Sequence, residues 1–147
     1  MRPDTPIVYQ GVDSFKGAGS DLPTTNRIRE ALKNQGFREP IHNVDMVQLA
    51  LLPELNTDVV IHPNSLEICH VHRSGVDNAE LFWQISQIVL SEMGIWNDVH
   101  QQTQTVIGSP EYFHRSATWT WEVEGYEVRY SRGNESMDTL RVTLERD

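Results

Sequence analysis

The sequence has a single cysteine, Cys69, among its 147 residues. One cysteine cannot form a disulfide within the chain, and this usage is typical of a protein that folds in a reducing compartment. The first residues hold no apolar stretch typical of a signal peptide, and the longest apolar runs are short, as in Leu49 to Leu52 and Ile88 to Leu90. A membrane-spanning helix needs about 20 apolar residues. We therefore expect a cytoplasmic protein that has no membrane partner.

Basic residues are also few. The chain has 12 Lys and Arg against 21 Asp and Glu, which gives a net charge of −9. A protein that binds nucleic acid by neutralising phosphates needs the opposite balance, so we expect no nucleic-acid partner. The acidity is uneven: residues 1–73 have a net charge of −2 and residues 74–147 a net charge of −7. A field of this sign speeds the encounter with a basic protein.

The common catalytic and nucleotide-binding motifs are missing. There is no G-x-S-x-G sequence for a serine nucleophile. The glycine-containing stretch Lys16–Ser20 matches neither the dinucleotide-binding motif nor the P-loop motif, and Asp13 and Asp21 on either side would repel a phosphate. We therefore expect neither a cofactor nor an enzymatic activity.

The length and the 38% hydrophobic content fit one folded domain, residues 1–147. Patterning predicts strands at 5–12, 57–62 and 66–73, and helices at 24–35 and 77–93. Residues 44–52 fit either a short helix or a buried strand. The glutamine-rich residues 97–104 read as a polar connection, followed by a weak strand at 103–107.

The C-terminal third has the clearest strand pattern. Apolar side chains alternate with polar ones on each side of Glu124-Gly125, which predicts a hairpin with a two-residue turn. This register pairs Trp119 with Tyr130, Trp121 with Val128 and Val123 with Tyr126. A third strand from residue 140 completes a meander. We expect a single α+β domain in which a mainly antiparallel sheet packs against two helices, with the chain forming two helix-then-meander halves.

Two histidines suggest one possible metal site. His70 and His72 lie two residues apart on a predicted strand, so their side chains point to the same face, whereas Cys69 points to the other. If the preceding turn has three residues, Asp58 pairs with His70 and joins the two imidazoles. Two imidazoles and a carboxylate can hold a metal ion. A metal-dependent enzyme or a metal-binding protein using Asp58, His70 and His72 is therefore our alternative prediction.

The acidic residues of the C-terminal meander suggest a different role. The predicted hairpin places Glu122 directly opposite Glu127 on the outer face of the sheet, with Glu124 at the tip and Glu145 near the end of the third strand. Like charges directly opposite each other are destabilising, and a cationic partner is one reason to retain them. We therefore predict a small acidic, non-enzymatic protein that binds a basic protein partner, as an inhibitor, an immunity protein, a secretion chaperone or an adaptor does.

Overall fold

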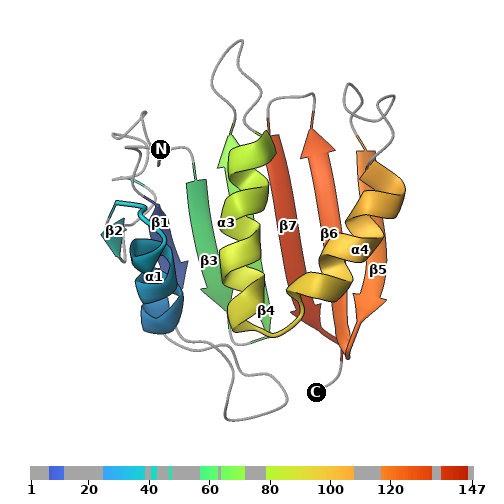
Figure 1. Cartoon of the computed structure of the whole chain (residues 1–147), viewed down its shortest axis with the longest axis horizontal. Coiled ribbons are helices and arrows are strands. Elements are labelled where there is room, and N and C mark those ends of the chain that lie inside the picture. The colour runs from blue at the N-terminus through green and yellow to red at the C-terminus, as the bar shows by residue number, and fades with distance from the viewer. Residues whose placement is uncertain are drawn as a thin grey trace.

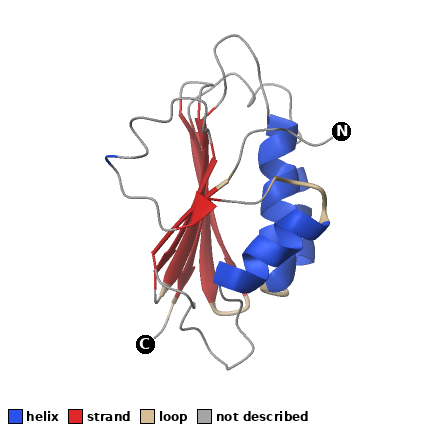
Figure 2. Ribbon diagram, turned by 90° about the vertical axis from the view of Figure 1, so that its left-hand side faces the viewer, coloured by secondary structure: helices blue, strands red, loops and turns tan. Residues whose placement is uncertain are grey.

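In the residues that the structure describes, seven strands form one sheet, and the helices α1, α3 and α4 lie along one of its faces (Figures 1 and 2). The computed structural model describes residues 7–11, 25–38, 41–42, 47, 57–62, 64–71, 79–107, 117–133 and 137–145. Within these ranges, no helix is long and apolar enough to cross a membrane.

The strands are β1 (Val8–Gly11), β2 (Ile41–His42), β3 (Thr57–His62), β4 (Ser65–Val71), β5 (Ala117–Val123), β6 (Tyr126–Gly133) and β7 (Met137–Leu144). The helices in the described residues are α1 (Thr25–Asn34), α3 (Ala79–Glu92) and α4 (Trp96–Ile107).

The strand order is β2-β1-β3-β4-β7-β6-β5. The strand β1 runs parallel to both of its neighbours, and every other pair is antiparallel. The pairing of β4 with β7 joins the first half of the chain to the second, so the two halves share one continuous sheet. The predicted α+β class and the C-terminal meander are both confirmed. The first half is not itself a meander, because β1 lies between two parallel neighbours.

The hairpin of β5 and β6 has the predicted register. Trp119 lies opposite Tyr130, Trp121 opposite Val128 and Val123 opposite Tyr126. The turn residues Glu124 and Gly125 have φ angles of 48° and 87°. Positive φ at both central residues is the type I′ turn, whose twist matches that of the flanking strands.

The C-termini of α1 and α3 have the same local structure. Gly36 and Gly94 have φ angles of 95° and 76°, as the sequence predicted for helix ends. After α1, the Phe37 N–H donates to the Leu32 carbonyl at 3.2 Å, and after α3, the Ile95 N–H donates to the Leu90 carbonyl at 3.2 Å. In each pair both side chains are buried. This is the Schellman motif with its apolar contact, and it fixes where the chain leaves each helix.

The core lies between the sheet and the helices. The strands contribute alternate residues to it, for example Val59 and Ile61 from β3, and α3 contributes Phe82, Ile85 and Val89. Such a one-sided sheet leaves its second face to polar residues. On the far face of β5, Thr118, Thr120 and Glu122 are exposed.

The helix α4 corrects one local prediction. We expected a polar connection at 97–104 and a strand at 103–107, but Trp96–Ile107 is helical. Its three glutamines suggested a loop, yet Trp96, Val99 and Thr103 recur at helical spacing and pack toward the core. The sheet therefore packs against α4 as well as the two expected helices. The segments predicted at 16–20 and 44–52 lie outside the described residues, apart from Val47, which is helical and exposed.

Candidate partner-binding surface

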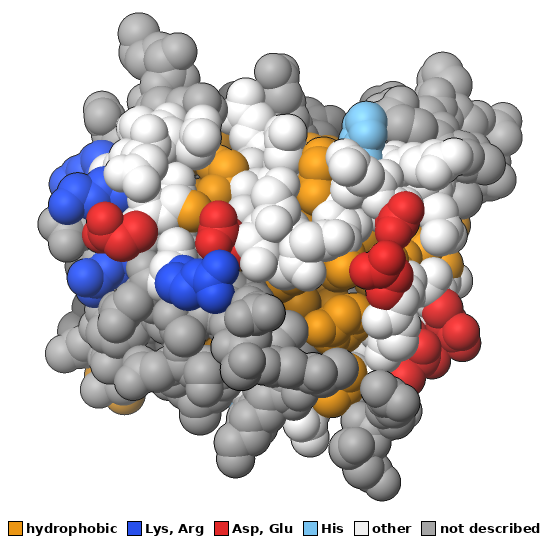
Figure 3. All heavy atoms as spheres, turned by 60° about the horizontal axis from the view of Figure 1, so that its bottom comes forward, with side chains coloured by type: hydrophobic (Ala, Val, Ile, Leu, Met, Phe, Trp, Pro, Cys, Tyr) orange, Lys and Arg blue, Asp and Glu red, His pale blue; other side chains and the backbone are white. Residues whose placement is uncertain are grey.

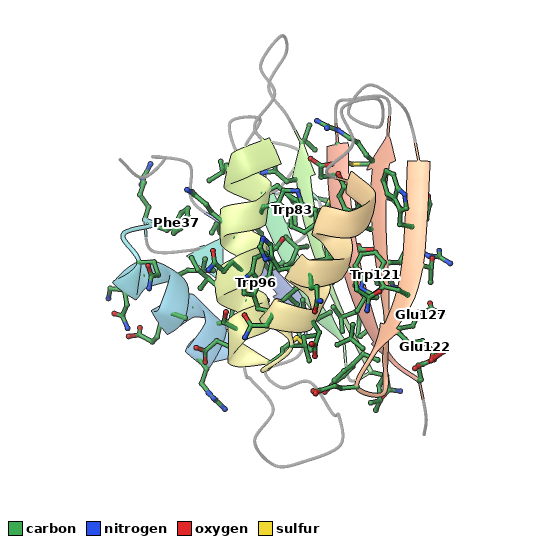
Figure 4. All side chains as sticks on the ribbon, turned by 45° about the vertical axis from the view of Figure 1, so that its right-hand side comes forward. Phe37, Trp83, Trp96, Trp121, Glu122 and Glu127 are labelled. Carbon is green, nitrogen blue, oxygen red and sulfur yellow. The ribbon has the colours of Figure 1, made fainter. Side chains whose placement is uncertain are left out.

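The predicted acidic residues come together at one end of the meander, which we call the acidic end (Glu122, Glu124, Glu127 and Glu145). Glu122 and Glu127 are directly opposite each other on β5 and β6. Figure 4 shows both side chains pointing away from the helices. The Glu145 N–H donates to the Gly125 carbonyl at 3.0 Å, which holds the end of β7 against the turn. The sequence-predicted cluster is therefore held together by backbone hydrogen bonds.

The carboxylates of the acidic end interact with one another. Local desolvation, together with repulsion from Glu122 and Glu127 and a side-chain hydrogen bond with Glu122, raises the pKa of the Glu145 carboxyl. A hydrogen bond between two carboxyl groups requires a proton on one of them. A cation bound here would replace that proton and relieve the repulsion.

No basic residue of the described chain offsets this charge by an ion pair. Arg129 follows Glu127 by two residues on the same face, and it lies opposite Thr120 on β5 and Arg141 on β7. Within the described ranges, no ion pair links Arg129 to the acidic end. In Figure 3, acidic side chains without neighbouring Lys or Arg lie at one side of the surface, and the Lys and Arg side chains lie at the other.

A hollow adjoins the acidic end and adds a carboxylate that the sequence did not predict. Its volume is about 180 Å³, and it is lined by residues of α4 and of the β5–β6 hairpin: Asp98, Gln101, Gln102, Glu122, Val123 and Glu124. A hollow of this volume has room for a side chain. Asp98 was missed because residues 97–104 were predicted to be a connection.

The proposed metal ligands do not converge. His62 pairs with Ser65, so the turn between β3 and β4 has two residues and not three. Asp58 therefore lies opposite Cys69, and His70 lies opposite Thr57 on the other face of the sheet. The predicted pairing of Asp58 with His70 is wrong. His72 is outside the described residues, and within them no group of three metal-ligating side chains is present.

The environment of Cys69 differs from that of His70, as the strand alternation predicted. Burial, which is partial here, raises the pKa of the Cys69 thiol, and nearby carboxylates act in the same direction. The Thr139 hydroxyl donates to Cys69 Sγ at 3.8 Å. A raised pKa keeps the thiol protonated and unreactive, which argues against a nucleophile at this position.

His70 instead belongs to a buried polar row that sequence reasoning missed. The row crosses the helix-covered face through Thr57, His70, Asp138 and Arg132, which are adjacent across β3, β4, β7 and β6. Thr57 Oγ1 and His70 Nδ1 are hydrogen-bonded at 2.7 Å. The Tyr130 hydroxyl donates to Asp138 Oδ1 at 2.5 Å, and Arg132 Nε lies 3.6 Å from the same oxygen.

A signal for this row was present in the sequence. Asp138 is in phase with Leu140 and Val142, and Arg132 is in phase with Val128 and Tyr130. A polar residue in phase with core residues is buried and must be paired. The contacts of Thr57 with His70, and of Asp138 with Tyr130 and Arg132, make the row part of the buried core, and the acidic end remains the candidate surface for a partner.

A second concave surface lies between α1 and α3. It has a volume of about 450 Å³ and is lined mostly by polar side chains: Ala31, Asn34, Gln35, Gln84, Gln87, Ile88, Ser91 and Glu92. An ion pair between Arg27 and Glu92, at 3.6 Å, links the two helices there. Glu92 is the one charged residue that lines this groove, and four of the other lining residues are amides. The lining therefore favours neither a cationic nor an anionic ligand.

Comparison with protein-family models, with curated protein sequences and with solved structures finds no match.

Proposed function

We propose that this protein is a small acidic binding protein, with no catalytic role of its own, whose acidic end recognises a basic protein. The observation that carries the proposal is the position of Glu122 directly opposite Glu127, with Glu145 close enough that local desolvation and repulsion from these two carboxylates raise the pKa of Glu145. Like charges held together without an ion pair from the described residues destabilise the free protein, and a cationic surface removes that cost on binding. An inhibitor, an immunity protein, a secretion chaperone or an adaptor would act in this way, in a reducing compartment such as the cytoplasm.

The overall charge supports the same proposal. Residues 74–147, which form the hairpin, α3, α4 and β7, have most of the negative charge, with a net value of −7. Such a field raises the association rate with a basic protein and loses its effect as salt screens it. The contacts of the acidic end would then fix the position of the partner.

The test is recovery of the partner from the native host by the tagged protein, at low and at moderate salt. The wild type is compared with a Glu122→Gln/Glu124→Gln/Glu127→Gln variant. We expect a basic polypeptide in stoichiometric amount with the wild type, and at least about a tenfold loss of its affinity in the variant, as removal of several interfacial charges predicts. A Glu30→Gln/Glu67→Gln/Glu92→Gln variant removes the same number of charges elsewhere and should retain the partner.

The pH dependence gives the recovered complex a second test. Glu145 has a raised pKa, so it takes up a proton earlier than an ordinary glutamate as the pH falls. Protonation removes a charge that the partner needs, and we expect affinity to fall as the solution is acidified through the carboxyl range. A partner that is acidic, or one that binds the triple variant as tightly as the wild type, would refute the proposed function.

A further inference from the structure

Among the residues that the structure describes, the strand β5 is an edge of the sheet. It is the last strand in the order β2-β1-β3-β4-β7-β6-β5, and its one described neighbour is β6. Figures 1 and 4 show it at the margin of the sheet, with α4 over its helix-side face and not along its edge. We propose that an extended segment of the basic partner adds to β5 as a further strand and places a Lys or Arg side chain in the neighbouring hollow. This inference rests on the proposed function and specifies how the partner binds.

The hairpin register shows which backbone groups are available. In a hairpin with a two-residue turn, the residues next to the turn exchange hydrogen bonds, so Val123 directs its N–H and C=O toward β6. Alternation gives Trp119 and Trp121 the same direction. The backbone groups of Thr118, Thr120 and Glu122 therefore point outward from the edge. In the described part of the chain, none of these three residues has a backbone hydrogen bond outside the ladder.

The edge also has few of the features that normally prevent strand addition, and Glu122 is its only charged residue. Natural sheets protect their edges with short strands, lysine, proline or β-bulges. The strand β5 has seven residues, in the sequence ATWTWEV, and all seven pair with β6 in an unbroken register. The opposite edge of the sheet, β2, has two residues. An edge this long and regular provides the backbone template used in strand-addition complexes.

Charge indicates what kind of segment the edge binds. Glu122 lies on the edge strand itself, and it is one of the residues that line the hollow, together with Asp98 and Glu124. An added strand would therefore pass three acidic residues at the C-terminal end of β5. A basic segment complements them, whereas a second copy of this chain would bring a further charge of −9 to the same surface. We therefore assign the edge to a basic segment and not to self-association.

The experiment uses the full-length protein and a synthetic peptide as the probe. The peptide has blocked ends and the length of β5, with lysine alternating with threonine and valine. Amide hydrogen exchange is followed by NMR with and without the peptide. We expect exchange to slow by about tenfold or more at the N–H groups of Thr118, Thr120 and Glu122, with little change at Trp119 and Trp121, which are already bonded to β6.

Two controls remove the added ladder and leave the charges in place. A peptide of the same sequence with methylated backbone nitrogens keeps its lysines but cannot donate hydrogen bonds. We expect its affinity to fall by about tenfold or more, because each lost hydrogen bond is worth a factor of about five. In the protein, Thr120→Pro blocks the edge yet spares the β5–β6 ladder, since the Thr120 N–H points outward. Thr120→Val keeps the N–H group and should bind as the wild type does.

The outcomes separate this inference from the proposed function. Equal binding of both peptides, with binding lost in the Glu122→Gln/Glu124→Gln/Glu127→Gln variant, would overturn strand addition and leave the acidic surface in place. If none of these changes alters the affinity, both the strand addition and the proposed function are wrong. If the free protein forms a dimer that protects the same three N–H groups, the edge belongs to a second copy and the inference is wrong. Should Thr120→Pro fail to fold, the methylated peptide still decides the question.

Discussion

At the scale of single residues, Asp138 is an acidic side chain inside the core. It is fully buried, accepts the Tyr130 hydroxyl at 2.5 Å, and lies 3.6 Å from Nε of the buried Arg132. A carboxylate without solvent exists in a folded protein only when such partners offset its desolvation. The loss of Asp138 would leave the guanidinium of Arg132 buried without this counter-charge.

We predict that Asp138→Asn lowers the free energy of unfolding by about 3 kcal/mol, because it breaks a buried ion pair from one side. Urea denaturation followed by circular dichroism measures the change. Tyr130→Phe removes only a hydrogen bond to a charged group and should cost about 1.5–3 kcal/mol. An Asp138→Asn variant as stable as the wild type would show that the row contributes little to the fold.

At the scale of elements, the β5–β6 hairpin combines a favourable turn with an unfavourable residue. The type I′ geometry needs positive φ at both central positions, and Gly125, which has no Cβ, adopts it without strain. Glu124 has a φ of 48°, which costs a residue with a Cβ about 1–2 kcal/mol. Asparagine is the usual residue at this position. Glu124 therefore lowers the stability of the turn, and it is one of the residues that line the hollow.

We predict that Glu124→Asn raises the free energy of unfolding by about 0.5–1 kcal/mol, because asparagine tolerates the left-handed conformation. Glu124→Gln removes the same charge but keeps the strained side chain, so it should change stability much less. Thermal unfolding of the two variants distinguishes backbone strain from charge. If glutamine stabilises the protein as much as asparagine does, repulsion and not conformation is the cost at this position.

At the scale of the whole molecule, the contact between β4 and β7 joins the two halves. Leu66 faces Val142 and Ile68 faces Leu140 across it, and all four side chains are fully buried. The halves therefore share their core, and neither has a complete apolar face of its own. One cooperative unit is the expected consequence.

We predict that Leu140→Ala destabilises the protein by about 2–5 kcal/mol and lowers a single unfolding transition for the whole chain. Far-UV circular dichroism reports on both halves, whereas fluorescence reports on the tryptophans, all of which lie in the second half. The two signals should have the same midpoint in the wild type and in the variant. Separate midpoints would show that residues 1–147 are not one folding unit.

The sequence by itself determined those features that depend on neighbours along the chain. Strand alternation around Glu124-Gly125 predicted the β5–β6 register and the pairing of Glu122 with Glu127. The glycines Gly36 and Gly94 marked two helix ends, because only a left-handed residue closes those turns without strain. The same local reasoning predicted the α+β class and the four residues of the acidic end.

Only the tertiary structure decided features that depend on partners distant in sequence. The turn between β3 and β4 is one residue shorter than predicted. Because side chains alternate with a period of two, this places Asp58 and His70 on opposite faces of the sheet. The glutamine-rich segment Trp96–Ile107 is helical because its apolar side chains pack against the core, and this helix brings Asp98 to the hollow. The buried row and the edge position of β5 likewise follow from the strand order, which in the described part of the chain brings β4 beside β7 and leaves β5 with one neighbour. Local sequence patterns do not contain that order, because it depends on which apolar faces cover one another in the folded chain.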